Sequence, residues 1–157
     1  MSAERTWERL VGETCWHVSV GGVTVPSFLL VLGERIPRER PIENPRQPEE
    51  YRRFKGSVEL LVWCSWRLET DDEVLASSVQ GETCVGELRR LRGATVSIAT
   101  CSRPAWDLTI RFTDNRHLVI FCDRMDSEAR AAHNWELWTP GVEATAGPGT
   151  TFETATR

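Results

Sequence analysis

The sequence predicts an α+β protein in which a bent antiparallel β-sheet, or half-barrel, of about six to eight strands carries one or two short helices. Short runs alternate between apolar and polar residues, and turn residues such as glycine and asparagine separate several of them. Only residues 2–10 and 82–92 have helical periodicity. We expect residues 1–140 to form a single globular domain and the Thr-, Ala- and Gly-rich residues 141–157 to form a flexible tail.

The first part of the chain predicts a helix followed by a hairpin. Residues 2–10 place Trp7 and Leu10 on one helical face. Residues 15–20 alternate as a strand, and Gly21-Gly22 predicts a tight turn because glycine adopts the positive φ that such turns require. A further apolar run then predicts the returning strand.

A long loop and the longest strand follow. Residues 34–50 (ERIPRERPIENPRQPEE) contain four prolines and predict an extended loop. Residues 57–69 (SVELLVWCSWRLE) predict one strand, with the even positions on one face and the odd positions, which include Leu61 and Trp63, on the other.

The second half predicts a short helix over 82–92, weakened by Gly86, and then strands at 95–101 and 134–139. Between these strands, residues 106–123 (WDLTIRFTDNRHLVIFCD) predict a hairpin that turns at Thr113-Asp114-Asn115, with Asn115 left-handed.

The hairpin leaves apolar residues on its odd face, where Val119 and Phe121 need a cover. Leu61 and Trp63, on the odd face of the strand predicted at 57–69, also need a cover. The cover is either a helix such as 82–92 or a partner protein. If it is a partner, the interface residues are Trp63, Leu61, Phe121, Val119 and Arg111.

The sequence predicts no catalytic, metal or cofactor site. The three histidines and five cysteines lack metal-ligand spacing, and no phosphate-binding loop or nucleophile motif occurs. The net charge of −4 argues against nucleic acid, and no long apolar run predicts a membrane span. The charged N-terminus and the odd number of separated cysteines favour a reducing, cytoplasmic location.

Two further features leave alternatives open. Seven tryptophans raise a rival hypothesis, a small ligand-binding protein or enzyme whose pocket is lined by Trp16, Trp66 and Trp106. Residues 9–14 and 90–95 share the pattern R-L-x-G-x-T, which either reflects an internal duplication or arose by chance.

Three segments, WCSWRLE (63–69), DLTIRF with its following DN turn (107–115) and NWELWT (134–139), resemble a group of small bacterial proteins. That group shares a W-R motif, a D-L-T-h-x-F-x-D-G hairpin and a W-x-L motif. This chain departs from the pattern at Asn115, where the group has glycine, and at Cys122, where proline is common. Such small acidic proteins look like immunity proteins of bacterial toxin systems. The resemblance implies a non-catalytic protein-binding function, with a cognate toxin as the partner of a monomer or homodimer.

Overall fold

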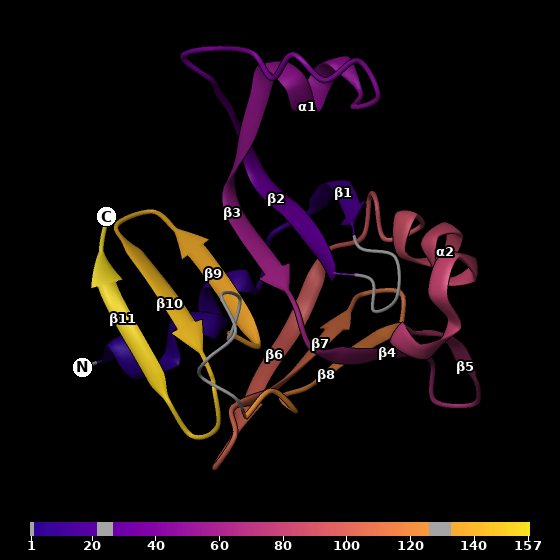
Figure 1. Ribbon diagram of the computed structural model, residues 1–157, viewed down its shortest axis with the longest axis vertical. Helices are drawn as coiled ribbons and strands as arrows, with labels where there is room; N and C mark the ends of the chain where they lie inside the picture. The colour runs from indigo at the N-terminus through magenta and orange to yellow at the C-terminus, as the bar shows by residue number, and fades with distance from the viewer. Residues whose placement is uncertain (1, 22–26, 126–132) are drawn as a thin grey trace.

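Two antiparallel β-sheets pack against each other as two layers in the computed structural model, which describes residues 2–21, 27–125 and 133–157 (Figure 1). The predicted turn at Gly21-Gly22 falls partly outside the described residues. The six-stranded sheet has the order β1 (Cys15–Gly21), β2 (Ser27–Pro37), β3 (Phe54–Val62), β9 (Trp135–Thr139), β10 (Val142–Ala146) and β11 (Phe152–Thr156). The five-stranded sheet has the order β5 (Val74–Ser77), β4 (Ser65–Glu69), β8 (His117–Phe121), β7 (Asp107–Phe112) and β6 (Val96–Ser102).

Short helical segments complete the fold. The 3-10 segment η1 contacts β6 of one sheet and β9 and β10 of the other. The helix α1 stands on the long β2–β3 ribbon, away from the two layers (Figure 1). These segments are η1 (Ser2–Leu10), α1 (Glu49–Arg53), the 3-10 segment η2 (Ser78–Cys84) and α2 (Val85–Arg89).

The prediction of antiparallel strands with short helices is confirmed, but the single bent sheet or half-barrel of six to eight strands is wrong. Residues 57–69 form two strands instead of one. Val62 pairs with Trp135 in the six-stranded sheet, whereas Ser65 pairs with Phe121 in the five-stranded sheet. The chain changes sheets in two residues, which keeps the alternation in phase and hides the break from the sequence pattern.

The even-numbered side chains of β3, β4, β7 and β8 point into one shared core, as the alternation predicts, and β9 contributes its odd-numbered Trp135 and Leu137. Val58, Leu60 and Trp66 are all buried there. The Phe28 ring of β2 meets the Trp66 ring of β4 edge to face, with centroids 5.3 Å apart. This contact joins the two layers, and burial of each large apolar side chain contributes about 1.5–3 kcal/mol.

The C-terminal residues 141–157 are not a frayed tail, and this prediction is corrected. They form β10 and β11, which pair with each other and extend the six-stranded sheet from β9. Ala144 and Ala146 are buried in the core, and the Phe152 ring stacks on Trp106 at 4.5 Å. These strands are rich in alanine and threonine, so the segment lacks a strong hydrophobic pattern.

Two predicted boundaries also move. The loop predicted at 34–50 is shorter, because β2 continues to Pro37 and pairs with Phe54, and α1 begins at Glu49. The helix predicted at 82–92 is α-helical only over α2. Gly81 has a φ of +66° and interrupts the preceding 3-10 turns, and Gly86 lowers the helix propensity of the remainder.

The two R-L-x-G-x-T segments, 9–14 and 90–95, lie side by side. Thr14 and Thr95 form an antiparallel bridge, and their hydroxyl oxygens are 2.7 Å apart. Each segment leaves a helical turn and enters a strand, β1 in one case and β6 in the other.

The hydrogen bonds between these segments are reciprocal. The N–H of Gly12 donates to the carbonyl of Val96 at 2.8 Å, and the N–H of Gly93 donates to the carbonyl of Cys15 at 2.7 Å. Both glycines have positive φ, +88° and +92°. Each glycine thus bonds to the residue three positions after the other, which is a local two-fold relationship.

The same relationship extends to the sheets. The order β1-β2-β3-β9-β10 in one sheet corresponds to β6-β7-β8-β4-β5 in the other. In each half, a three-stranded meander is followed by a crossing into the opposite sheet, between β3 and β4 in one half and between β8 and β9 in the other. Equivalent β-bulges follow Cys15 in β1 and Val96 in β6. This is the arrangement expected of a duplicated unit, and it favours that explanation of the repeat.

Candidate functional site

The outer face of the five-stranded sheet is formed by side chains of β4, β8, β7 and β6 that point away from the shared core. The predicted covering helix does not lie on it, because Leu88 and Leu91 are buried in the core between the sheets. Among the described residues, Val119 and Phe121 on this face are half-buried. The outer face therefore presents apolar side chains that the helix of residues 82–92 leaves uncovered.

Apolar side chains occur across this face. The guanidinium of Arg67 lies over the Phe121 ring, 5.1 Å from its centroid. Val119 sits in register between Arg67 on β4 and Thr109 on β7. On the edge strand, Ile98 is 51% exposed and stands opposite Arg111. Arginine and phenylalanine are residue types enriched at protein interfaces.

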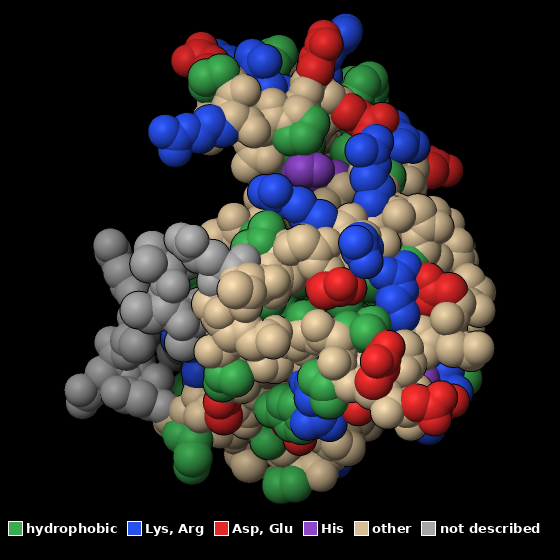
Figure 2. Space-filling view, turned by 90° about the vertical axis from the view of Figure 1, so that its right-hand side faces the viewer, with side chains coloured by type: hydrophobic (Ala, Val, Ile, Leu, Met, Phe, Trp, Pro, Cys, Tyr) green, Lys and Arg blue, Asp and Glu red, His purple; other side chains and the backbone are tan. Residues whose placement is uncertain are grey.

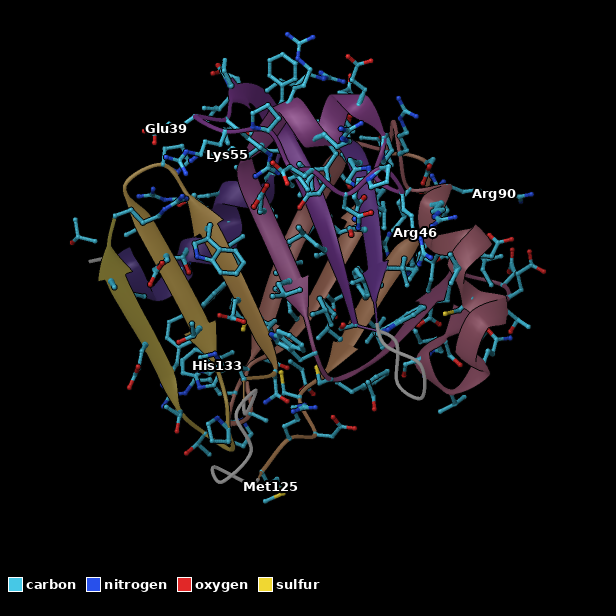
Figure 3. The ribbon with its side chains drawn as sticks, turned by 45° about the horizontal axis from the view of Figure 1, so that its top comes forward. Glu39, Arg46, Lys55, Arg90, Met125 and His133 are labelled. Atoms are coloured by element: carbon cyan, nitrogen blue, oxygen red, sulfur yellow. The ribbon has the colours of Figure 1, made fainter. Side chains whose placement is uncertain are left out.

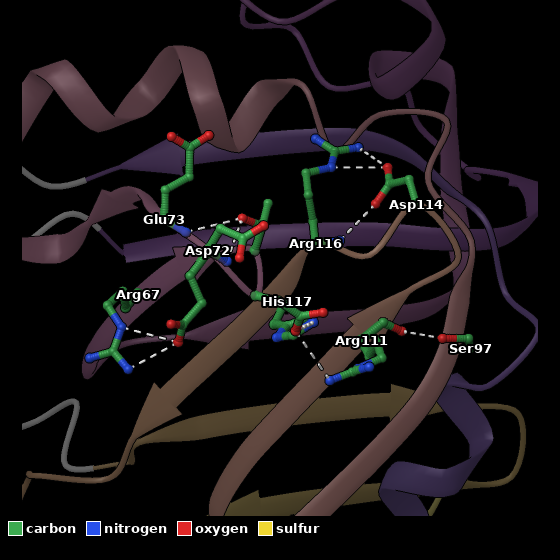
Figure 4. Close-up of polar contacts among 11 residues, drawn as sticks. Arg67, Asp72, Glu73, Ser97, Arg111, Asp114, Arg116 and His117 are labelled. Atoms are coloured by element: carbon green, nitrogen blue, oxygen red, sulfur yellow. Dashed lines mark hydrogen bonds and ion pairs between the residues drawn. The ribbon is translucent and has the colours of Figure 1, made fainter.

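Charged groups border this apolar surface (Figure 4). The carboxylate of Asp71 approaches His117 Nε2 at 3.4 Å and Arg111 Nη2 at 3.9 Å. Asp71 begins an exposed acidic turn that continues through Asp72 and Glu73 between β4 and β5. The Asp71 side chain is largely exposed, so these ion pairs contribute little stability and solvent still reaches the carboxylate.

The structure brings together three of the five predicted interface residues: Phe121, Val119 and Arg111 lie on neighbouring strands of one face. Leu61 and Trp63 do not join them. Leu61 belongs to β3 of the six-stranded sheet, and the Trp63 indole N–H donates to Glu136 Oε2 of the same sheet at 2.7 Å.

Leu61 and Trp63 follow the same pattern around β3 as Val119 and Phe121 do in β8, and β3 and β8 correspond in the two halves of the fold. The two pairs nevertheless lie on the outer faces of different sheets. The crossing between β3 and β4 separates them. The sequence-based grouping of Trp63 with Phe121 is therefore corrected.

Three residues of the face were missed from the sequence. Arg67 shares the odd parity of Leu61 and Trp63, and this parity could have identified it. Ile98 is displaced by the β-bulge between Val96 and Ile98, which no local pattern announces. Asp71 lies in a turn, and its proximity to His117 depends on the pairing of β4 with β8.

The structure has a cavity with tryptophan in its wall, but most of the wall residues differ from those predicted for the ligand-binding pocket. A cavity of about 660 Å³ lies beside η1, the end of β6 and β11, with Trp7, Trp106 and Phe152 in its wall. Of the three predicted tryptophans, only Trp106 lines it. Trp66 is buried in the core, and Trp16 is covered by the Arg35 guanidinium at 4.8 Å.

The chemistry of this cavity is limited. Burial, with a smaller contribution from the Asp107 carboxylate, raises the pKa of the Cys101 thiol to about 12, so the thiol is protonated at neutral pH. The Arg103 guanidinium covers one face of Trp106, 5.2 Å from the ring centroid. Apolar groups could be held here, but the wall presents no thiolate for nucleophilic attack.

The cysteines are free thiols in the structure. Contact with the Cys64 thiol, together with burial, raises the pKa of Cys122 well above its ordinary value. Within the described part of the chain, no three His, Cys, Asp or Glu side chains are grouped to hold a metal ion. The helices of that part are all too short or too polar to cross a bilayer.

Comparison of this chain with models of protein families, with curated proteins and with solved structures gave no match.

Proposed function

We propose that this protein is a non-catalytic binding protein that docks a partner protein on the outer face of the five-stranded sheet. The observation that carries the proposal is the half-buried Phe121 under the Arg67 guanidinium, on a sheet face that the predicted helix does not cover. Val119 and the exposed Ile98 extend this apolar area. A partner would bury these side chains, and a well-packed aromatic–arginine pair is typical of binding hot spots.

The acidic turn beside this face supports a finer proposal, that the partner is a bacterial toxin with a basic surface. Asp71, Asp72 and Glu73 are exposed at the margin, and the chain has a net charge of −4. Acidic groups at an interface margin accelerate association with a basic partner and choose its orientation. The resemblance to immunity proteins agrees with this chemistry, and the proposed location is the cytoplasm.

Co-expression with the product of the neighbouring reading frame tests this function. We expect that product to stop growth when expressed alone, and growth to recover when this protein is co-expressed. The purified pair should form a stable complex by size-exclusion chromatography. A Val119→Arg variant should fail in both assays, because a charge would be buried in the interface.

A matched control is Leu61→Arg, which places the same charge at the corresponding position of the other sheet. It should retain binding and rescue. Equal binding by the Val119→Arg variant would show that the partner does not use this face. Normal growth of cells that express the product of the neighbouring reading frame alone would contradict the proposal that the partner is a toxin.

A further inference from the structure

A second cavity, of about 500 Å³, lies between β1, the segment 44–48 and α2, away from the outer face of the five-stranded sheet. Three separate parts of the chain contribute to its wall, so only the folded protein forms it. The polar residues of its wall are His17, Ser19, Asn44, Arg46, Gln47 and Arg89.

His17 is the most constrained polar group of this wall. It is 9% exposed, and its ring stacks on Tyr51 of α1 with centroids 4.3 Å apart. Among the described residues, no group forms a hydrogen bond of normal geometry with the buried His17 Nε2, although the Gln47 side chain lies close enough to the imidazole to raise its pKa. Buried polar atoms nearly always have a partner, so an unpartnered imidazole nitrogen in a cavity wall points to a group that binds there.

Two exposed arginines of the wall also lack partners within the described residues. Within the described part of the chain, the side chains of Arg46 and Arg89 make no hydrogen bond or ion pair. By contrast, two arginines that follow Arg89 in the chain have carboxylate partners: Arg90 pairs with Glu87 at 3.4 Å, and Arg92 approaches Glu50 at 3.9 Å. Figure 3 shows Arg46 and Arg90 on the same side of the molecule, and both residues are exposed.

Neutral polar groups complete the wall. The Gln47 amide donates to the Ser19 hydroxyl at 3.3 Å. The Asn44 side chain accepts a hydrogen bond from the backbone N–H of Arg46 at 3.0 Å, which fixes the backbone that carries this arginine. The cavity therefore combines two unpaired guanidinium groups with hydroxyl, amide and imidazole groups.

We propose that this cavity binds the phosphate group of a small molecule. Guanidinium groups bind phosphate through paired, charge-assisted hydrogen bonds, and two of them can hold one oxyanion between them. The hydroxyl and amide groups can bind the remainder of the ligand, and the volume is in the range of small-molecule sites. The inference goes beyond the proposed partner-binding function and uses none of its residues.

The electrostatics of His17 agree with an anion in this position. Burial, reinforced by the positive charges of Arg92 and Arg89, lowers the pKa of His17 below its ordinary value. The nearby Glu50 carboxylate and the Gln47 amide act in the opposite direction. An anion beside the arginines offsets their charge and shifts the pKa of His17 upward, so binding perturbs the imidazole signals directly.

Nuclear magnetic resonance of the histidine imidazoles, with inorganic phosphate as the probe, tests this proposal at pH 7. His17 is assigned by comparison with a His17→Gln variant. Its signals should shift saturably at roughly millimolar phosphate, whereas those of His117 and His133 should not. Chloride at matched ionic strength should have no effect. Acetate distinguishes a carboxylate site, which would shift His17 at the same concentrations as phosphate, and such a result would contradict the assignment to phosphate.

The variants separate the cavity from general surface charge. Arg46→Ala and Arg89→Ala should each weaken phosphate binding by about tenfold, as expected for loss of one charge-assisted contact. Arg90→Ala removes a charge from the next residue, which caps α2 and lies outside the cavity wall, and this variant should bind phosphate like the original protein. An unshifted His17 in wild-type protein, or equal binding by Arg46→Ala and Arg90→Ala, would overturn the proposal. Binding of a partner to the Val119 face should be unchanged in all three variants.

Discussion

The guanidinium of Arg67 lies 5.1 Å from the centroid of the Phe121 ring, on the outer face of the five-stranded sheet. Trp63, four residues before Arg67 in the chain, bonds to Glu136 on the other sheet. Because Phe121 and Trp63 lie on different sheets, we expect substitution of one to affect partner binding and substitution of the other to leave it unchanged.

Phe121→Ala should abolish capture of the partner, whereas Trp63→Ala should leave it intact, because only Phe121 lies on the proposed interface. Phe121 is half-buried, so its loss should cost about 1 kcal/mol of unfolding free energy, including the contact with Arg67. Isothermal titration with the partner and urea denaturation measure the two effects. Trp66→Ala, a core truncation on β4, is the control and should cost about 3–5 kcal/mol. A loss of that size for Phe121→Ala would show that this face is part of the core.

Removal of residues 141–157 should prevent cooperative folding. The deletion takes away β10 and β11, exposes the edge of β9 and removes the buried Ala144 and Ala146 from the core. Circular dichroism during heating should show loss of the sharp transition. A truncated protein that melts within a few degrees of the full chain would show that β10 and β11 are not needed for the stability of the fold.

A single substitution isolates the same region. Phe152→Ala removes the ring stacked on Trp106 and should cost about 1–3 kcal/mol, because the side chain is partly exposed. Glu153→Ala, at the next and exposed position, should change stability by less than about 0.5 kcal/mol. Equal effects of the two substitutions in urea denaturation would remove the stacking explanation.

The buried Cys15 and the partly buried Cys101 should make the protein less stable at alkaline pH. Burial raises the pKa of Cys15 to about 11 and that of Cys101 to about 12, from an ordinary value of 9.0. Below pH 9 these thiols are protonated in both states, and their contribution to stability is complete. As the pH rises further the unfolded thiols ionise first, so the unfolding free energy should fall between pH 9 and about 11–12.

Urea denaturation across this pH range measures the fall, and a Cys15→Ala variant should show a shallower one. The protonated thiols should also react slowly with a disulfide reagent at pH 8 until the protein is denatured. Rapid reaction of Cys15 in the native protein would contradict its burial.

Gly12→Ala and Gly93→Ala should destabilise the protein by similar amounts, about 1–2 kcal/mol each. Both glycines have φ near +90°, and a methyl group added at either position would meet no other atom. The cost is therefore conformational, because an L-residue resists the left-handed region. Urea denaturation tests the equality, with Gly86→Ala as a control in α2, where alanine should be neutral or stabilising. Clearly different losses of unfolding free energy for Gly12→Ala and Gly93→Ala would show that the two glycines are not structurally equivalent.

Several sequence predictions succeeded because they depend on neighbouring residues. The alternation of β3, β4, β7 and β8 identified the buried faces, since strand side chains alternate wherever the strand is placed. The left-handed Asn115, with a φ of +69°, follows from the turn itself. The repeat at 9–14 and 90–95 was visible as sequence before the structure placed its two copies together.

The candidate sites depended on the tertiary structure. Parity identified Val119 and Phe121 as outward-facing but could not separate them from Leu61 and Trp63, because a crossing of two residues preserves the alternation. The cavity beside His17 joins β1 to a loop and a helix far away in the chain.

The sequence by itself determined which side chains face inward and where the chain turns, whereas the tertiary structure decided which strands are neighbours. Alternation and turn geometry are set by each residue and its immediate neighbours along the backbone. The backbone hydrogen bonds that join strands are chemically the same for every partner, so the choice between one sheet and two rests on packing across the core. That packing, through Phe28 and Trp66, keeps the two sheets as separate layers, so Phe121 and Trp63 lie on different outer faces.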